Sequence, residues 1–457
     1  MALSDAKTAP ATLPGSDAPA RLSTWQQITL NLFWFANNFH WQALLAILIP
    51  SEVAKLLGDA HKTSNLPLVV VWGTLVAFLV NPMVGAISDY ARFKLGRRRP
   101  FMIIGTVPNV LALIGLALAQ QIGEAVRPVL GTTTDAAVLI TMAVLFLVLQ
   151  FSNNFANAPW SAIIADKVPA AQRGSASGWY GLMSLLGTIG GVVLVGFLVD
   201  KTVALDVYKT QLLVAYGLIA FVQVLFVTLT VATVHERPLT ERRPFRWGVL
   251  ARLYWVSPRR YPDFVWVLFT RLLMMIGIWA IFYFLQYYFD DVLQSSKLLG
   301  ISGEKAVGAY FLPIVMVTAV STTLIAGKVS DRVGRKKLVY LAGAVMSVVC
   351  LLFIFAQSLP GALAAAAFFG LGWGAYTSVD WALATDVLPP TDEYGKDMGI
   401  WTAAGILPQV IGIVLGGAIL SALQPLPHHQ GYSVLFAVVV AFFVLGTIFV
   451  YQVKGAK

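Results

Sequence analysis

Twelve apolar stretches, each about as long as the 20-residue helix that crosses a bilayer, run through the chain. They make it 58% hydrophobic and leave it 12% charged, about half of the charged share typical of soluble proteins. The stretches are continuous rather than alternating, so a membrane β-barrel is excluded along with a soluble enzyme, a disordered chain and a fibrous repeat. We therefore expect an all-α polytopic membrane protein with twelve transmembrane helices.

The order of these stretches predicts two bundles of six helices. A basic loop, residues 235–262, divides the chain in the middle, so we expect a mobile tail at 1–24, bundles at 25–234 and 263–453, and a short tail at 454–457. The expected spans are Trp25–Pro50, Leu66–Ile87, Phe101–Gln120, Ala136–Ile163, Gly174–Val199, Gln211–Val234, Asp263–Phe289, Ala306–Lys328, Leu338–Ala356, Gly361–Val387, Met398–Leu423 and Tyr432–Val453.

The net charge of +10 raises the possibility of nucleic-acid binding, but the positions of the basic residues argue for a membrane topology. Most of the 32 Lys and Arg residues fall in the loops on one side, together with both termini. This bias places both termini in the cytoplasm of a multi-pass protein of the inner or plasma membrane. The single cysteine, Cys350, lies inside a span, and the first 20 residues have no apolar core, so we expect no disulfide, metal site or signal peptide.

The two halves carry matching segments in the same order, which indicates duplication. Gly85 to Asp89 matches Gly327 to Asp331, and each is followed by a Gly-Arg-basic triplet at 96–98 and 334–336. Further along, Asp166 with its following Pro matches Asp386 with its own, at the same spacing. Duplicated six-helix halves are typical of transporters, whose site lies between the halves near the membrane midplane.

At this point the sequence resembles a known family. Gly327 to Lys337 is similar to the inner-loop signature of the major facilitator superfamily. The first 180 residues most resemble its glycoside/sugar–cation symporters, nearest the sucrose–proton group. The segments that carry this likeness are Asn38-Phe39-His40-Trp41 with Pro50, Val80-Asn81-Pro82 with Ser88-Asp89 and Gly96 to Phe101, and Pro159 with Asp166. The group has Arg where this chain has Ser161, so the resemblance implies a sugar or glycoside without specifying sucrose.

The repeated inner loops predict a cytoplasmic gate. A Gly lets helices approach closely, an Asp at a helix end accepts from donors and from a facing Arg, and the basic run faces anionic lipid. The simpler interpretation is that the basic run only sets topology. The expected gate residues are Gly85, Asp89, Gly96, Arg97, Arg98, Asp166, Asp331, Arg332, Gly334, Arg335 and Asp386.

Polar residues inside the first span are the first candidates for the site, because polar groups are costly in a membrane. His40 lies mid-span, where an imidazole can exchange a proton, contact substrate or simply pack against a neighbouring helix. Helical spacing puts Asn37, His40 and Trp41 on one face, with Asn38 and Gln42 beside it.

Two matching polar stripes are the second set of candidates. The fourth span carries Asn153, Asn157, Trp160 and Ser161, and the tenth carries Trp373, Thr377, Asp380 and Trp381, at the same helical spacing. Amides hydrogen-bond hydroxyls and indoles cover the apolar faces of a sugar ring, so we expect the stripes to face each other across a binding cavity. The alternative is hydrogen bonding between helices.

Arg271 and Asp380 are charged residues inside the seventh and tenth spans, and both lie in the inner third. A pair would resolve two costly burials, and protonation of Asp380 would then release Arg271 during a transport cycle. The alternative is that Arg271 reaches the inner surface alone. Trp279 and Gln286 in span seven and Gln409 in span eleven complete the expected site, although aromatic residues in spans often only pack.

Other functional classes fit less well. The sequence has no nucleotide-binding loop, paired-cysteine motif or His-rich metal pattern, which argues against an ATP-driven pump or a membrane enzyme. A channel or scaffold would not require duplicated halves with central ionisable residues. The nearer rival is a proton-driven exporter of drugs or metabolites, although Gly187 to Gly191 lacks the Pro of the antiporter motif. We expect a monomeric, cofactor-free secondary transporter that couples uptake of a sugar or glycoside to protons by alternating access.

Overall fold

Helices account for the whole architecture that the computed structural model describes, namely residues 21–169, 172–234, 236, 257–355, 358–387, 394–423 and 430–454. No strand occurs among them, and twelve helices are long and apolar enough to cross a membrane. The all-α, twelve-span prediction is therefore confirmed. The expected tails and central loop fall mostly on residues 1–20, 237–256 and 455–457, which lie outside the described residues.

The first half begins with a helix that bends in the middle. Ser23 caps α1 (Thr24–Ala43) through a reciprocal pair of hydrogen bonds with Gln26. A wider turn, Leu44–Leu48, then leads into α2 (Ile49–Leu56), so this span continues past Pro50, where the sequence predicted its end. The remaining helices of this half are α3 (Lys62–Tyr90), α4 (Arg99–Ala117), α5 (Ala119–Leu130), α6 (Thr134–Lys167), α7 (Arg173–Leu198) and α8 (Leu205–Thr233).

The second half follows the same plan. Its helices are α10 (Pro262–Asp291), the short α11 (Ser295–Leu299) and α12 (Gly303–Lys305), α13 (Leu312–Val333), α14 (Arg335–Phe355), α15 (Leu359–Asp386), α16 (Tyr394–Leu423) and α17 (Gln430–Phe449). A wider turn at Ala306–Phe311 joins α12 to α13, as the equivalent turn joins α1 to α2. The amphipathic α5 is an addition that the apolar pattern did not predict.

Helix packing repeats between the halves, as duplication predicts. In the first half α1 packs on α7 and α8, while α6 packs on α3 and α4. In the second half α10 packs on α16 and α17, while α15 packs on α13 and α14. The matching loop glycines Gly96 and Gly334 even share a φ of 104°, a conformation that favours glycine. The two halves thus have one internal design.

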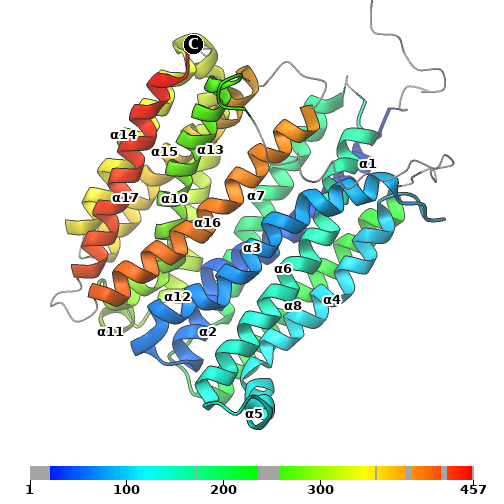
Figure 1. Cartoon of the computed structure of the whole chain (residues 1–457). Helices are drawn as coiled ribbons and strands as arrows, with labels where there is room; N and C mark the ends of the chain where they lie inside the picture. Colours follow the sequence, from blue (N-terminus) through cyan, green and yellow to red (C-terminus); the bar gives the residue numbers. More distant parts are fainter. Residues whose placement is uncertain are drawn as a thin grey trace, which may run out of the picture.

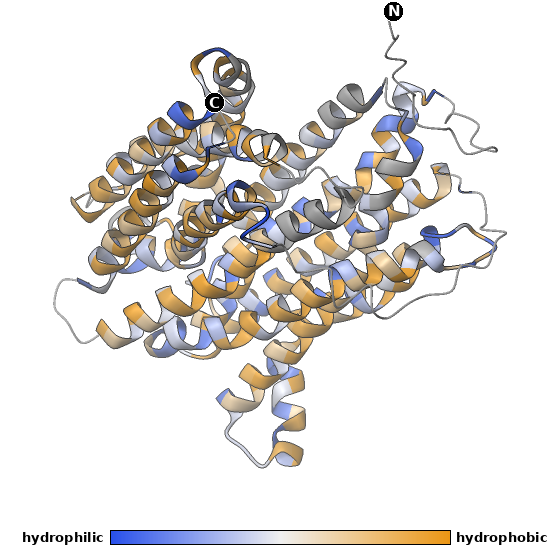
Figure 2. Ribbon diagram, turned by 45° about the horizontal axis from the view of Figure 1, so that its top comes forward, coloured by the Kyte–Doolittle hydropathy of each residue, from blue (hydrophilic) through white to orange (hydrophobic). Residues whose placement is uncertain are grey.

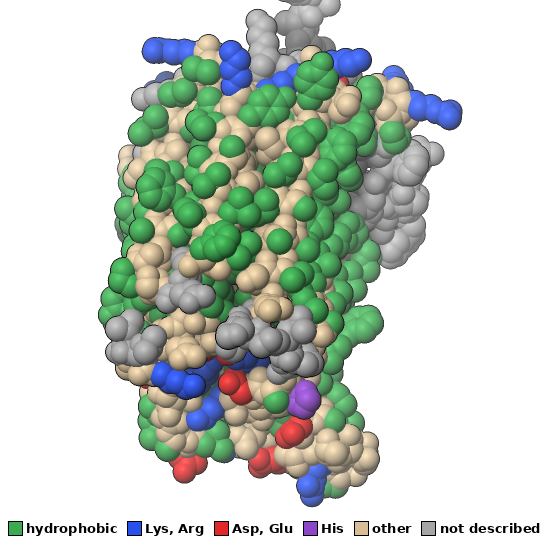
Figure 3. Space-filling view, turned by 90° about the vertical axis from the view of Figure 1, so that its left-hand side faces the viewer, with side chains coloured by type: hydrophobic (Ala, Val, Ile, Leu, Met, Phe, Trp, Pro, Cys, Tyr) green, Lys and Arg blue, Asp and Glu red, His purple; other side chains and the backbone are tan. Residues whose placement is uncertain are grey.

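The two ends of the molecule differ. We call the end where α1 begins and α17 finishes the terminal end, and the opposite end, with α2, α5, α11 and α12, the far end (Figure 1). The helices are mostly apolar along their lengths (Figure 2), and one face in space-filling view shows a hydrophobic band between ends that carry Lys and Arg side chains (Figure 3). This band is what a membrane-spanning protein requires.

The halves meet closely at the far end. Gly196 of α7 and Gly308, ahead of α13, are so close that a Cβ built on Gly196 would lie 2.8 Å from the Cα of Gly308. Thr63 of α3 and Ser421 of α16 exchange a hydrogen bond of 3.1 Å between the halves. The described residues therefore form a closed seam at the far end.

Candidate functional site

The ionic centre of the second half is a pair between α10 and α15. The Arg271 guanidinium forms a hydrogen-bonded salt bridge with one oxygen of Asp380. The Tyr376 hydroxyl, one turn earlier on α15, donates to the other oxygen over 3.0 Å. Both charged side chains are largely buried, at 17% and 5% exposed. Because a lone buried charge is costly, this pairing explains how α10 and α15 can each carry one.

Gly405 of α16 completes the surroundings of this pair. A Cβ at this position would lie 3.2 Å from a guanidinium nitrogen of Arg271, so the absent side chain leaves room for the Arg. Three helices of the second half, α10, α15 and α16, thus meet at this ion pair. A proton that neutralises Asp380 would remove the attraction that holds Arg271 against α15.

The corresponding region of the first half is neutral. The Trp41 indole of α1 donates to the Asn153 side-chain oxygen of α6 over 2.9 Å. Asn153 is buried and its NH₂ group has no hydrogen-bond partner among the described residues, as is also true of the Asn157 side-chain oxygen one turn later. Ser161 is exposed and donates to the Asn157 carbonyl. These amides are available to hydroxyl groups of a ligand.

Trp160 lies apart from this polar set, and His40 lies beside it. The Trp160 indole is fully buried, donates to the Leu30 carbonyl of α1 over 2.9 Å and stacks on Trp34. His40 is fully buried and stacks on Trp41, and neither of its ring nitrogens has a hydrogen-bond partner among the described residues. The placement of Trp160 favours the packing interpretation over direct substrate contact.

The other predicted residues are spread along the spans. Asn38 donates to the Trp34 carbonyl within α1, Gln42 is half-buried, and the buried Asn37 has an unpartnered oxygen. Trp279 packs edge-to-face against Phe282 and at a tilt against Tyr283, Trp373 lies among apolar residues of α10 and α13, and Gln409 is half-buried. Thr377 donates to its own helix. Gln286 alone lies elsewhere, at the far end, where it donates to Glu304.

The expected gate is described only in part. Four gate side chains lie outside the described residues, those of Asp89, Asp166, Asp331 and Asp386. The same is true of Gly327 in the inner loop and of the Trp381 side chain, which belongs to the polar stripe of the tenth span. A Cβ built on Gly85 would lie at ordinary van der Waals distance from Ala158. Arg332 is exposed. The backbone N–H groups of Arg98 and Arg99 donate to Glu236 over 2.9 and 3.0 Å. Glu236 thus stabilises the start of α4, where a helix favours negative charge.

Three further acidic or hydroxyl groups were missed from the sequence. Tyr376 is one helical turn from Asp380, a spacing that could have identified it. Glu52 and Glu304 are fully buried at the far end, yet both lie just beyond the spans predicted from hydropathy. Among the described residues no group of three His, Cys, Asp or Glu side chains is suited to a metal ion.

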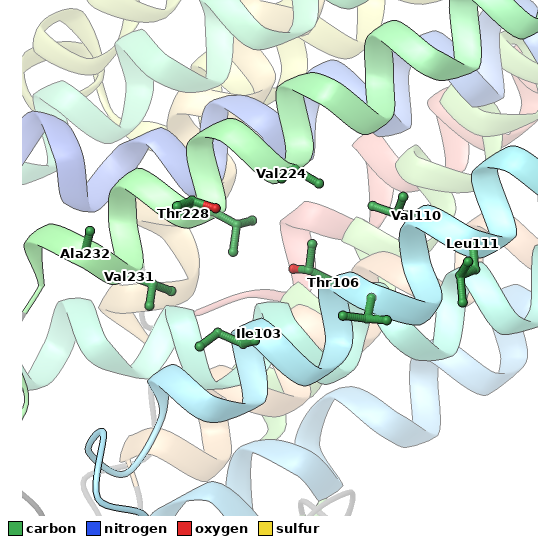
Figure 4. A pocket seen from close by; sticks show the side chains of 10 residues that line it. Ile103, Thr106, Val110, Leu111, Val224, Thr228, Val231 and Ala232 are labelled. Carbon is green, nitrogen blue, oxygen red and sulfur yellow. The ribbon is translucent and has the colours of Figure 1, made fainter.

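One large groove is unsuited to a polar solute. It lies between α4 and α8 and has a volume of about 520 Å³ (Figure 4). Its lining is aliphatic apart from Thr106 and Thr228, and Val107 and Leu111 are exposed at the outer surface of the bundle. Such a surface suits lipid chains, so the polar residues of α1, α6, α10 and α15 remain the candidate site.

Comparison with known proteins agrees with this architecture. The chain is 29% identical over 217 residues to the sucrose transport protein SUC4 of Arabidopsis thaliana. This match covers 44% of this chain and 40% of that protein. It is 32% identical over 163 residues to SUC3 of the same plant, covering 34% of this chain and 26% of that protein. The matched stretches thus span less than half of these relatives.

Solved structures share the fold at low identity. The nucleoside transporter NupG has a TM-score of 0.66 at 12% identity, covering 94% of this chain and all of that one. A D-xylose-proton symporter also has a TM-score of 0.66, at 19% identity, covering 94% and 98%. The model of the MFS/sugar transport protein family matches residues 64–453. The chain therefore belongs to the MFS/sugar transport protein family, whose members are membrane transporters and not enzymes.

Proposed function

We propose that this protein is a proton-coupled symporter that carries a sugar or glycoside by alternating access. The observation that carries the proposal is the buried Arg271–Asp380 pair, because it sets a titratable carboxylate between two helices of one half. The neutral amides Asn153 and Asn157 in the other half supply hydrogen-bonding groups suited to hydroxyls. Ligand and proton are thereby recognised by different halves, which must close on each other.

The cycle follows from these two sets of groups. When Asp380 is ionised, it retains Arg271 and keeps α10 and α15 together. A proton on Asp380 frees the guanidinium, and a bound sugar between the halves then lowers the free energy of the closed form. Substrate alone leaves the ion pair intact, so the solute and the proton move together.

The direction of transport rests on the orientation. The terminal end carries the basic loops, so we assign it to the cytoplasm and the far end to the outside of an inner or plasma membrane. The names of the relatives, which include sucrose transport proteins and a D-xylose-proton symporter, support a sugar as the substrate and a proton as the coupling ion. We propose that one chain is the functional unit.

Uptake into proteoliposomes tests the proposal. Purified protein is reconstituted, an acidic-outside pH gradient is imposed, and radiolabelled mono- and disaccharides are offered with and without a protonophore. We expect at least one sugar to accumulate only while the gradient lasts. Gradient-driven efflux of lipophilic cations with no sugar uptake would instead identify a drug exporter and overturn the proposal.

A further inference from the structure

The far-end seam contains a set of charges that the central site does not involve. Two ion pairs cross between the halves there, Lys62 to Asp291 at 2.6 Å and Lys201 to Asp290 at 2.5 Å. Burial disfavours the charged form of Lys201, but the carboxylates of Glu304 and Asp290 outweigh this effect and raise its pKa. Lys201 is therefore charged at neutral pH, where its contribution to stability is constant.

Glu304 is the first carboxylate that these lysines compensate only in part. It is fully buried, and Gln286 donates to its Oε1 over 2.6 Å. Lys201 stands 3.9 Å from that oxygen and makes its short contact with Asp290 instead. Oε2 of Glu304 has no hydrogen-bond partner among the described residues. An ionised carboxylate in this position would be poorly compensated.

Glu52 is the second carboxylate of the seam that lacks full compensation. It lies on α2 in the other half, is also fully buried, and accepts a hydrogen bond from the Tyr216 hydroxyl of α8. Its Oε2 has no partner, and no Lys, Arg or His of the described residues lies within ion-pair distance. The seam thus encloses four carboxylates, those of Glu52, Asp290, Asp291 and Glu304, against the two ammonium groups that pair there.

A pair of hydrogen-bonded hydroxyls lies near the two glutamates. The hydroxyls of Ser51 and Tyr208 lie 2.8 Å apart. Ser51 faces Glu304, and Tyr208 lies in the electrostatic field of both glutamates. Because a hydroxyl can donate and accept at once, this pair is suited to passing a proton between the glutamates of the two halves.

The side chains around Glu52 and Glu304 suit a proton better than a metal ion. A divalent cation takes six or more oxygens, whereas each glutamate offers one open oxygen beside neutral groups and one lysine. The groups that face Glu52 and Glu304 come from the neighbouring elements of both halves: Ser51, Lys201, Tyr208, Tyr216, Gln286, Tyr287 and Asp290.

We propose that Glu304 and Glu52, linked through Ser51 and Tyr208, form a second proton-binding site, and that the far-end seam closes only when this site holds a proton. Opening of the seam separates Glu304 from Ser51 and Lys201 of the other half and exposes it to solution. The site then gains or loses its proton, and closure buries the neutral form. That the proton is exchanged with the outside of the membrane rests on the proposed function, which assigns the far end to that side.

A distance measurement without substrate tests the proposal. Spin labels are attached at Gln121→Cys on α5 and Gln430→Cys on α17, two exposed far-end positions on opposite halves, in a Cys350→Ala background. Double electron–electron resonance in nanodiscs then gives the ratio of open to closed seam from acidic to alkaline pH. We expect this ratio to rise about tenfold per pH unit where the site titrates.

Substitutions show which carboxylate is responsible for the pH dependence of the seam. Glu304→Gln, which imitates the protonated group, should keep the seam closed at every pH, and Glu52→Gln should weaken the pH dependence. The control Asp206→Asn, at an exposed carboxylate on α8, should follow the wild-type curve. A wild-type curve in Glu304→Gln, or a ratio that follows Na⁺ concentration rather than pH, would overturn the proposal.

Infrared spectroscopy decides the matter if Glu304→Gln does not fold. The carboxylic-acid C=O band of the wild-type protein should titrate together with the seam and should persist in Asp380→Asn. A band that vanishes in Asp380→Asn would assign the only buried proton to the central site and refute the second one. Since neither method measures sugar transport, failed sugar uptake with a titrating seam would refute the proposed function alone.

Discussion

In each half a hydrogen bond from or to a side chain of the fourth membrane helix joins it to the first one. We call this contact the tie; the two ties lie at equivalent places but differ in chemistry. In the first half the Trp160 indole of α6 donates to a backbone carbonyl of α1, at Leu30. In the second half Asp380, the repeat equivalent of Trp160, binds the Arg271 side chain of α10. The first contact cannot titrate, whereas the second can. The two halves thus share a contact at the same place, but only the contact of the second half contains an ionisable group.

The substitution expected to have the largest effect on this difference is Asp380→Asn. The variant keeps the shape of the side chain but cannot exchange a proton, so a pH gradient has nothing to drive. Wild-type vesicles should accumulate the sugar up to about tenfold per pH unit if one proton is coupled, and the variant should only equilibrate it.

Sugar exchange separates coupling from binding in this variant. Exchange of internal for external sugar should persist, because it does not require the coupling proton to be released. Unchanged accumulation together with unchanged exchange in Asp380→Asn would show that the two ties do not differ in the proposed way.

A double-mutant cycle measures the strength of the charged tie. Arg271→Gln leaves the Asp380 carboxylate buried without its cation, and such a loss costs about 3–5 kcal/mol. The double variant Arg271→Gln/Asp380→Asn removes both charges and should be much closer to the wild type in thermal stability. If the two single substitutions simply add, the pair is not coupled and the comparison fails.

Hydropathy and repeat spacing predicted the twelve helices, the duplication and the residues Arg271 and Asp380. These features follow from the cost of exposing apolar groups in water or burying charges in lipid, which local sequence records. The rotation of α1 and α6 about their axes was not predictable. It set the Trp160 indole against α1 and Trp34, because side-chain fit between helices decides which face points inward.

The glutamates of the far end were missed for another reason. Glu52 follows the predicted end of the first span and Glu304 precedes the predicted start of the eighth, so both looked like loop residues at the membrane surface. In the structure the turns at Leu44–Leu48 and Ala306–Phe311 carry both glutamates into the seam between the halves. Contacts between distant segments created their burial, and no local pattern contains that information.

The neutral tie should contribute stability without governing transport. Trp160→Phe keeps most of the stacking on Trp34 but leaves the Leu30 carbonyl without its donor, at a cost of about 1–2 kcal/mol. We expect a lower unfolding temperature with an unchanged KM for sugar. Trp41→Phe is the matched variant, since its indole binds Asn153 of the polar set, and it should change the KM several-fold. Equal KM changes in both would place Trp160 in the binding site after all.

The smallest expected effect probes the space around the charged tie. An alanine at Gly405 would bring its Cβ to 3.2 Å from the Arg271 guanidinium, which must then shift by a few tenths of an ångström. Gly181→Ala on α7 is the control, because a Cβ there has nothing within 4 Å. Alanine in a helix is worth about 0.5–1 kcal/mol over glycine, so the control should be slightly more stable than wild type. Gly405→Ala should lose that gain and shift the pH at which uptake is half-maximal, because the displaced guanidinium holds Asp380 less firmly in its ionised form. An unshifted pH profile would mean that Arg271 does not govern proton binding at Asp380, and the charged tie would then be as purely structural as its neutral counterpart.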